Sequence, residues 1–240
     1  MKNNLSENKK KKPIIGIIKP DTKFQRILGD IGNPNTWNLP VIYKVMKGIS
    51  PEKVIHNDDS ELFSNAIETA KILEEQGVHA ITTTCGFLIK YQKAISNSVN
   101  VPVFTSSLLQ VPMIYHMLNR NSKIGVLTAS CKAINKKHLD DNGLNNIPLA
   151  LKGMDDFDYF QMVFIKNQQE KFNRERIKAE VIEAAIDLRN SGNELGAVVL
   201  ECTNMSPYAY DIQNNINLPV FDMYSLMQWM YAGLIKEKFN

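Results

Sequence analysis

Residues 77–87 of this 240-residue chain read GVHAITTTCGF, and these residues define a unit that the chain repeats. The run from Val78 to Thr84 is rich in β-branched residues and has no turn signal, which is typical of a parallel strand covered on both faces. Cys85 follows where the strand ends, and Gly86 opens a tight turn. The stretch therefore predicts a buried strand with a thiol at its carboxyl end.

The same pattern returns 117 residues later. Residues 195–204 read LGAVVLECTN, a second apolar strand that ends on a cysteine, Cys202. Beyond each cysteine comes another matching pair, VPVF around Pro102 and LPVF around Pro219, again 117 residues apart. We interpret the chain as two similar halves, each with a thiol in the equivalent place.

Each half contains short apolar runs that alternate with helical patterns. Such alternation predicts parallel strands joined by right-handed crossovers. We therefore expect an α/β fold of two pseudo-symmetric lobes, each a parallel sheet of about four strands flanked by helices. The predicted strands are residues 13–18, 41–46, 78–84, 101–104, 123–128, 148–151, 195–202 and 218–221. Ligands of such sheets bind beyond the carboxyl ends of the strands, so we expect the active site in the cleft between the lobes.

The predicted domain boundaries follow from the repeated segments. Residues 1–12 are interpreted as a disordered basic leader, and residues 113–217 as the second lobe. Residues 13–112 and 218–240 are assigned to the first lobe, because residues 218–221 resemble that lobe's own last strand. The alternative is that the final strand stays with the second lobe and the two lobes are sequential.

Two helices near the C-terminus carry further predictions. Pro207 suits the first turn of a helix that Ser206 would cap. The C-terminal helix is expected over residues 224–239, and its apolar side could pack on its own lobe or on a second copy of the chain. That apolar side consists of Met227, Trp229, Met230 and Leu234.

The distribution of charge excludes several classes of protein. Residues 1–12 contain five lysines and one glutamate, so a formal net charge of +3 for the whole chain leaves −1 on the remainder. The fold itself therefore has no basic stripe of the kind that binds nucleic acid. The leader lacks the apolar core of a signal peptide, and no apolar run is long enough to span a membrane.

The patterns of cysteine, histidine and glycine residues exclude several kinds of functional site. The three cysteines are odd in number and include no CxxC pair, which indicates a reducing, cytoplasmic setting rather than a disulfide framework. The four histidines lack metal-ligand spacing, so we expect no metal site. The chain also lacks the glycine-rich nucleotide motifs and the GxSxG motif of many serine hydrolases.

Two thiols that face one cleft suggest a paired acid and base. Each thiol is expected near backbone N–H groups and the positive end of a helix, which would lower its pKa below about 8.5. Removal of a proton from one face of a carbon and delivery to the other face inverts its configuration, and no cofactor is required if the carbanion is stabilised. A single buried cysteine is usually part of a core, but the pair at duplicated positions favours function. Cys131 has no counterpart and is assigned a structural role.

Four motifs together resemble the aspartate/glutamate/hydantoin racemase superfamily, over nearly the whole chain after residue 12. They are residues 29–34 (GDIGNP), 83–88 (TTCGFL), 105–110 (TSSLLQ) and 200–204 (LECTN). The resemblance implies a cofactor-independent enzyme with two pseudo-symmetric lobes, in which Cys85 takes the proton from the D form of the substrate and Cys202 from the L form.

The chain departs from the glutamate racemases of that superfamily at three places. Gly86 and Phe87 stand where those enzymes have Asn-Thr, and Asn204 stands where they have His. The segment from Lys19 to Asp21 replaces an Asp-Ser pair after the first strand. The lobes and thiols therefore transfer from the family, whereas the substrate does not.

Further candidate binding residues lie beside the thiols and at the matching sheet edges. Side chains and backbone N–H groups next to the cysteines could hold a carboxylate, although the same residue types also cap helices. Arg26, in the long first loop, could hold a second carboxylate or be a surface charge. The predicted substrate-binding residues are Asn33, Thr84, Gly86, Ser106, Thr128, Thr203 and Asn204.

The leading hypothesis is a pyridoxal-phosphate-independent amino-acid racemase or epimerase, with Cys85 and Cys202 as the two bases. One alternative is a thiolate-dependent isomerase or decarboxylase of a small dicarboxylate. The other is a non-catalytic protein that binds a small molecule on the same fold. All three predict a small carboxylate or amino acid as the ligand.

Overall fold

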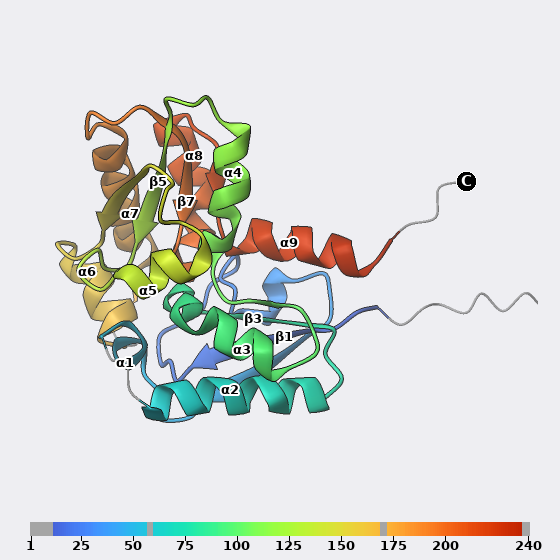
Figure 1. Cartoon of the computed structure of the whole chain (residues 1–240). Coiled ribbons are helices and arrows are strands. Elements are labelled where there is room, and N and C mark those ends of the chain that lie inside the picture. The colour runs from blue at the N-terminus through green and yellow to red at the C-terminus, as the bar shows by residue number, and fades with distance from the viewer. Residues whose placement is uncertain (1–11, 57–59, 169–171, 237–240) are drawn as a thin grey trace, which may run out of the picture.

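The computed structural model describes residues 12–56, 60–168 and 172–236, and these form two parallel four-stranded sheets (Figure 1). The strand order is β2-β1-β3-β4 in the first sheet and β6-β5-β7-β8 in the second. The predicted α/β fold with two similar parallel sheets is therefore confirmed. The predicted disordered leader lies outside the described residues, apart from Lys12.

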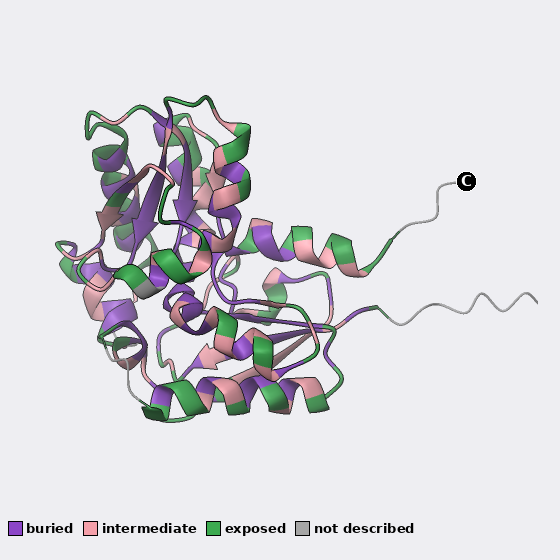
Figure 2. Ribbon diagram, in the orientation of Figure 1, coloured by how far each residue is buried: buried purple, intermediate pink, exposed green. Residues whose placement is uncertain are grey.

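Strand bounds agree closely with the apolar runs of the sequence. The first sheet consists of β1 (Ile15–Pro20), β2 (Val41–Met46), β3 (Ala80–Thr83) and β4 (Val103–Phe104). The second consists of β5 (Lys123–Thr128), β6 (Leu149–Gly153), β7 (Leu195–Leu200) and β8 (Val220–Phe221). All residues of β3 and most of β7 are buried, since these strands lie inside their sheets with helices around them (Figure 2).

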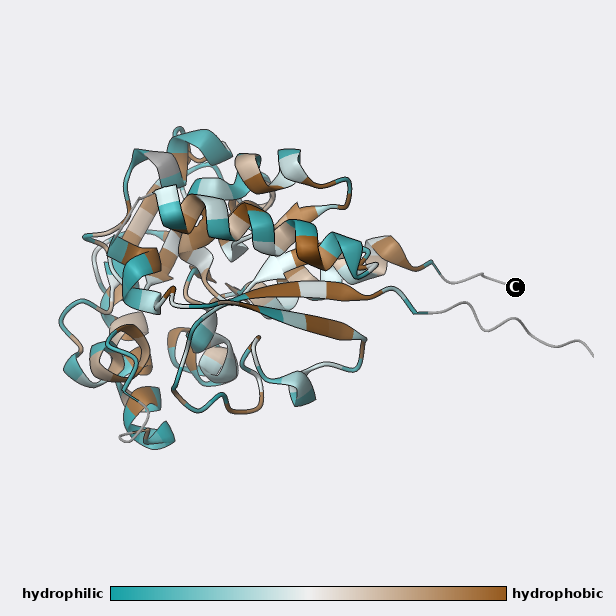
Figure 3. Ribbon diagram, turned by 90° about the horizontal axis from the view of Figure 1, so that it is seen from below, coloured by the Kyte–Doolittle hydropathy of each residue, from teal (hydrophilic) through white to brown (hydrophobic). Residues whose placement is uncertain are grey.

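The helices cover the sheets with their apolar sides. Those of the first half are α1 (Pro51–His56), α2 (Ser60–Glu75), α3 (Gln92–Ser98) and α4 (Val111–Met117). Those of the second half are α5 (Lys136–Leu139), α6 (Asp158–Phe160), α7 (Arg174–Arg189), α8 (Ala209–Ile216) and α9 (Met223–Leu234). In α2, the buried residues Leu62, Ala66 and Leu73 recur at helical spacing, and polar residues face outward (Figure 3).

Short tight helices complete the chain between these elements. In the described part of the chain, five are 3-10 helices: η1 (Pro34–Thr36), η2 (Gly86–Tyr91), η3 (Ser107–Gln110), η4 (Asp140–Asn142) and η7 (Thr203–Tyr208). One is a π-helical turn, η5 (Gln161–Ile165), that directly continues α6. Among the described residues, no helix is long and apolar enough to cross a membrane.

The assignment of the last strand to the first lobe is wrong. β8 pairs with β7 in the second sheet, with Val198 opposite Val220. The matching sequences of β4 and β8 indicate equivalent positions in two sheets, not a shared sheet, because β4 stands next to β3 as β8 stands next to β7.

The helix that follows β8 nevertheless reaches the first sheet. Met223, Leu226 and Met227 of α9 join a buried cluster with Ile15 and Ile17 of β1. Met230 and Leu234 pack against the same cluster, whereas the Trp229 side chain is 59% exposed. The apolar side of the C-terminal helix thus packs within the chain.

Several local predictions also need correction. The helix expected to start at Pro207 is preceded by η7, which contains Pro207, and α8 begins at Ala209. Ser206 does not cap it, because the helical backbone already starts beyond Cys202. The short helices α1 and α4 were not predicted.

Polar contacts and a common core hold the two lobes together. Ser107 Oγ, beyond the end of β4, donates a 2.6 Å hydrogen bond to the carbonyl of Leu200 in β7. One buried cluster contains Ile18 and Phe87 from the first lobe together with Leu127 and Phe160 from the second. The carboxyl ends of the central strands therefore meet at a packed interface.

Candidate active site

Cys85 and Cys202 occupy equivalent corners of the two lobes. Each lies two residues beyond its strand, β3 or β7, and stands at the N-terminus of a 3-10 helix, η2 or η7. The backbone N–H groups of Phe87 and Asn204 donate hydrogen bonds to the two thiols. The repeated sequence therefore folds twice into the same strand-to-helix corner.

Both thiols line one cavity, which has an empty volume of about 350 Å³. Thr203 Oγ1 donates a 2.7 Å hydrogen bond to the carbonyl of Thr84, which ties the two corners directly to each other. Cys202 is buried, with 7% of its surface exposed, and Cys85 is half-buried. The two thiols therefore line the same space between the lobes.

The other predicted binding residues divide into two groups. Thr84, Gly86, Thr203 and Asn204 line the cavity with the thiols. The remaining three are not among its lining residues, and each instead supports a neighbouring group. Asn33 Nδ2 donates to the carbonyl of Arg26 at 2.9 Å, Ser106 Oγ accepts from the N–H of Leu108 at 3.3 Å, and Thr128 Oγ1 donates to Glu201 at 2.8 Å.

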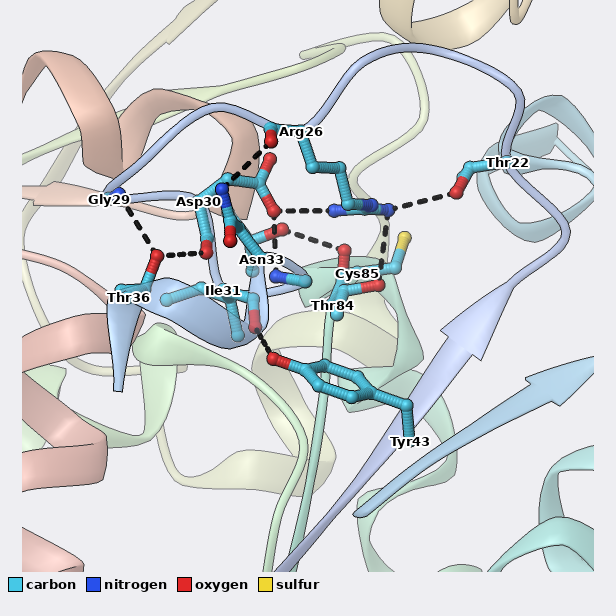
Figure 4. Close-up of polar contacts among 12 residues, drawn as sticks. Thr22, Arg26, Gly29, Asp30, Ile31, Asn33, Thr36, Tyr43, Thr84 and Cys85 are labelled. Carbon is cyan, nitrogen blue, oxygen red and sulfur yellow. Dashed lines mark hydrogen bonds and ion pairs between the residues drawn. The ribbon is translucent and has the colours of Figure 1, made fainter. Parts of the chain in front are cut away.

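Arg26 is placed in the cavity wall by the GDIGNP turn (Figure 4). Its Nη1 lies 2.7 Å from Asp30 Oδ1, and the two side chains are 8% and 3% exposed. Asp30 Oδ1 also accepts from the N–H of Gly32 at 2.7 Å. A side chain at Gly32 would collide with the Arg26 guanidinium, so the glycine leaves room for it. Arg26 Nη2 reaches Thr84 Oγ1 at 3.5 Å, beside Cys85.

Glu201 is a buried carboxyl in the same cavity, and only 1% of its surface is exposed. Its Oε2 accepts the hydrogen bond from Thr128, whereas its Oε1 has no hydrogen-bond partner among the described residues. A side chain at Gly86 would collide with both Oε1 and the backbone carbonyl of Glu201. The carboxyl of the second lobe thus packs directly against the corner of the first. Burial raises the pKa of Glu201 to about 7.

The thiol pKa values are displaced upward. Burial, followed by the nearby carboxyl of Glu201, raises the pKa of Cys85 to about 12. The same two causes raise the pKa of Cys202 well above its ordinary value. The expected lowering is therefore wrong: the hydrogen bonds from Phe87 and Asn204 do favour the thiolates, but desolvation and the carboxyl outweigh them.

The cavity is covered by contacts between the first loop and the segment after η5. Asn167 Oδ1 accepts from the N–H of Lys23 at 2.6 Å, and its Nδ2 donates to the carbonyl of Asp21 at 3.1 Å. We call these two hydrogen bonds of Asn167 the latch. Next to the latch, the rings of Phe24 and Phe164 meet edge to face with centroids 4.9 Å apart. Because both rings line the cavity, this contact closes one side of it.

Sequence reasoning assigned no role to Glu201 and left Arg26 undecided. A charged residue directly after an apolar strand and directly before a site cysteine is a usable signal for Glu201. Phe24 and Phe164 offered no comparable signal, because their positions depend on a loop and on a π-helical turn.

Solved structures of known proteins share this two-lobed architecture. Allantoin racemase from Klebsiella pneumoniae aligns with a TM-score of 0.65 and 17% identity, over 92% of this chain and 87% of the racemase. Arylmalonate decarboxylase aligns with a TM-score of 0.61 and 11% identity, over 95% and 94% of the two chains. Aspartate racemase from Picrophilus torridus aligns with a TM-score of 0.56 and 17% identity, over 92% and 94%.

The chain has the fold of the aspartate/glutamate racemase superfamily. In this chain, the two cysteines follow the central strands β3 and β7, and both line the cavity between the lobes. No family model matches the sequence.

The proteins that are similar in sequence are named lyases, not racemases. The chain is 24% identical to a dimethylsulfoniopropionate lyase from Durusdinium sp. clade D, over 92% of this chain and 75% of that protein. It is 26% identical to dimethylsulfoniopropionate lyase 3 from Emiliania huxleyi (strain CCMP1516), over 93% of this chain and 60% of that protein. The racemase-type fold is therefore shared with racemases and a decarboxylase, whereas the sequence is similar to that of lyases.

Proposed function

We propose that this protein is a cofactor-independent enzyme that removes a proton from the carbon next to a carboxylate of a small substrate. Cys85 and Cys202 are the acid and base on opposite faces of that carbon. The observation that carries the proposal is that both thiols line one cavity together with Arg26. Arg26 would orient the substrate carboxylate through its guanidinium N–H groups.

The displaced pKa values suit this chemistry. A hydrogen next to a carboxylate is very weakly acidic, so a strong base is needed to remove it. A thiol whose pKa is raised to about 12 gives, once ionised, a more basic thiolate than an ordinary cysteine does. The opposite thiol stays protonated and can deliver its proton to the other face. One thiol therefore has to be ionised and the other neutral for turnover.

Two reactions can follow the loss of the proton. If the next carbon carries a leaving group, the carbanion expels it and a double bond forms, which is a lyase reaction. We place this reaction first, because relatives similar over 92–93% of the chain are named dimethylsulfoniopropionate lyases. Dimethylsulfoniopropionate would give acrylate, dimethyl sulfide and one proton by this route.

The second candidate is racemisation or epimerisation of an amino acid. If no leaving group is present, the opposite thiol reprotonates the carbanion and inverts the carbon. The presence of a thiol from each lobe favours this reaction, because elimination alone needs only one base.

One set of assays tests the proposal and separates the two candidates. The protein is incubated in D₂O with dimethylsulfoniopropionate and with single enantiomers of amino acids, and the products are followed by NMR and chiral chromatography. We expect dimethyl sulfide release from the first or deuterium-labelled inversion of one of the others. The absence of elimination, inversion and α-deuterium exchange with every compound would contradict the proposal and favour the non-catalytic binding protein.

A further inference from the structure

Glu201 is the one ionisable side chain lining the described cavity that the proposed proton transfer leaves without a task. It is 1% exposed and rests against the Gly86 corner. Thr128 and the backbone N–H of Ala129 hydrogen-bond its carboxyl. Its Oε1 remains without a hydrogen-bond partner among the described residues. A buried carboxylate with an unused oxygen is costly unless a ligand satisfies it.

The charge of Arg26 does not neutralise this carboxylate. Arg26 already forms an ion pair with Asp30 at 2.7 Å, and both of these side chains are almost completely buried. The ionised carboxyl of Glu201 therefore adds a negative charge to a wall in which the other two charges cancel. Lys90, on η2, lies close enough to affect Cys85, and its ammonium donates to the carbonyl of Val54 at 2.9 Å.

The apolar part of the cavity wall also suits a cation. Phe87 and Phe164 line the cavity together with the carboxyl of Glu201, whereas the Arg26 guanidinium already lies over the ring of Phe24, 4.8 Å from its centroid. Aromatic faces attract organic cations such as ammonium and sulfonium groups, most strongly where water is excluded. A second carboxylate would instead meet the charge of Glu201 at short range.

We infer that Glu201 is a cation subsite, which selects substrates that carry an ammonium or sulfonium group in addition to a carboxylate. The inference rests on the proposed function for the position of the carboxylate near Arg26. Glu201 would discriminate against neutral acids and dicarboxylates of the same size. Dimethylsulfoniopropionate and amino acids both belong to the selected class, so the subsite is compatible with either reaction.

The subsite also links binding to the ionisation of the thiols. The carboxyl of Glu201 is one cause of the raised pKa of both cysteines. A cation seated against Glu201 offsets that negative charge and so lowers the thiol pKa values in part, while burial, the larger cause, still keeps them raised. A zwitterionic substrate would thereby favour formation of the thiolate that attacks it.

Two ligands that differ only in charge test the subsite. The trimethylammonium betaine of β-alanine and 4,4-dimethylpentanoate, in which an uncharged tert-butyl group replaces the trimethylammonium group, have the same shape, and calorimetry gives the Kd of each. We expect the wild-type protein to bind the betaine at least about tenfold more tightly at pH 8. The preference should diminish as the pH falls through about 7, where Glu201 becomes protonated.

Glu201→Gln removes the charge and keeps the shape. The Gln carbonyl oxygen can still accept from Thr128 and Ala129. We expect Glu201→Gln to bind the two ligands with Kd values within about threefold of each other, chiefly because it binds the betaine more weakly than the wild type does. Glu194→Gln, the same change at an exposed position, is the matched control and should keep the preference.

Three outcomes would overturn the subsite: equal binding of both ligands by the wild type, no binding of the betaine, or a preference that survives in Glu201→Gln. The pH dependence in the wild type provides the test without any variant, if Glu201→Gln does not fold. None of these measurements requires turnover, so the subsite can fail while the proton exchange assay succeeds, and the reverse.

Discussion

The Cys85 corner and the Cys202 corner have similar backbones but differently charged neighbours. In both, a buried strand ends two residues before the cysteine, and a backbone N–H two residues later donates to the thiol. The residue before Cys85 is Thr84, which accepts a hydrogen bond from Arg26. The residue before Cys202 is Glu201, whose carboxyl packs against Gly86. A duplicated fold thus supplies two similar acid–base groups, and single residues beside them distinguish the two ends of the cavity.

The largest expected effect comes from replacing one thiol at a time. Cys85→Ser and Cys202→Ser should each abolish racemisation in both directions, with losses on the order of 10²–10⁴ in kcat, because every inversion needs one group to take a proton and one to give it. Elimination needs one base only. With an amino acid that has a leaving group on its β-carbon, Cys85→Ser should therefore still eliminate from the L form and Cys202→Ser from the D form.

The measurement is product release from each enantiomer by each variant. If both variants process both enantiomers equally, the assignment of one thiol to one face is wrong. Cys131→Ser is the matched control, because Cys131 does not line the cavity, and its activity should equal that of the wild type.

The next largest effect is expected from a substitution that disrupts the packing of Glu201 against Gly86. Gly86→Ala should lower the free energy of unfolding by about 1–3 kcal/mol, because the new methyl group collides with the carbonyl and the carboxyl of Glu201. Gly233→Ala is the control: its methyl group meets no atom within 4 Å, and alanine in the exposed helix should stabilise the protein by up to about 1 kcal/mol. Urea unfolding of both variants measures this, and equal stabilities would contradict the close packing of the corners.

The buried carboxyl also predicts a dependence of stability on pH. Because the pKa of Glu201 is raised from 4.5 to about 7 in the folded state, the folded protein holds a proton that the unfolded chain releases. The wild type should therefore lose stability as the pH rises from about 4.5 to 7, by at most about 3 kcal/mol, and lose no more from this group above that range.

Glu201→Gln cannot show this loss, so its stability advantage over the wild type should grow between those pH values. Urea unfolding at several pH values measures the difference, with Glu194→Gln as the control. A difference that stays constant from pH 4.5 to 8 would contradict the burial of an ionisable carboxyl.

The smallest expected effect concerns the latch over the cavity. Asn167→Gly keeps a backbone with φ of 59° acceptable but removes the two hydrogen bonds to the first loop. We expect iodoacetamide to label Cys85 and Cys202 roughly three- to tenfold faster, because loss of the two hydrogen bonds together favours opening by about 1 kcal/mol. Asn217→Gly, at a φ of 51° away from the cavity, should leave the labelling rates unchanged. Equal rates in both variants would show that the latch does not control access.

The sequence predicted the parts of this molecule that depend on local pattern. The apolar runs identified all eight strands, and the repeat at 117 residues indicated two equivalent thiol corners. The repeat could not say to which sheet the strand at Val220 belongs, because similarity shows equivalence and not adjacency. That choice depends on the pairing of β8 with β7.

The electrostatics of the site could not be predicted from the sequence. The helix N-terminus beside Cys85 was visible in the pattern, but burial and the carboxyl of Glu201 act against it and determine the direction of the pKa shift. The ion pair that holds Arg26 depends on how residues 29–34 turn, and a list of residue types does not contain that geometry.

The most direct test of the account follows the two α-hydrogens of a ligand that has no chirality of its own. The betaine of β-alanine and 4,4-dimethylpentanoate are each incubated in D₂O with the protein, then recovered and converted to esters of a chiral alcohol, in which NMR distinguishes the two α-hydrogens and shows which one is replaced. Two thiols on opposite faces predict that the wild type replaces both hydrogens, whereas Cys85→Ser replaces one and Cys202→Ser replaces the other. Replacement of the same single hydrogen by all three proteins, or of neither hydrogen by the wild type, would contradict a two-thiol site.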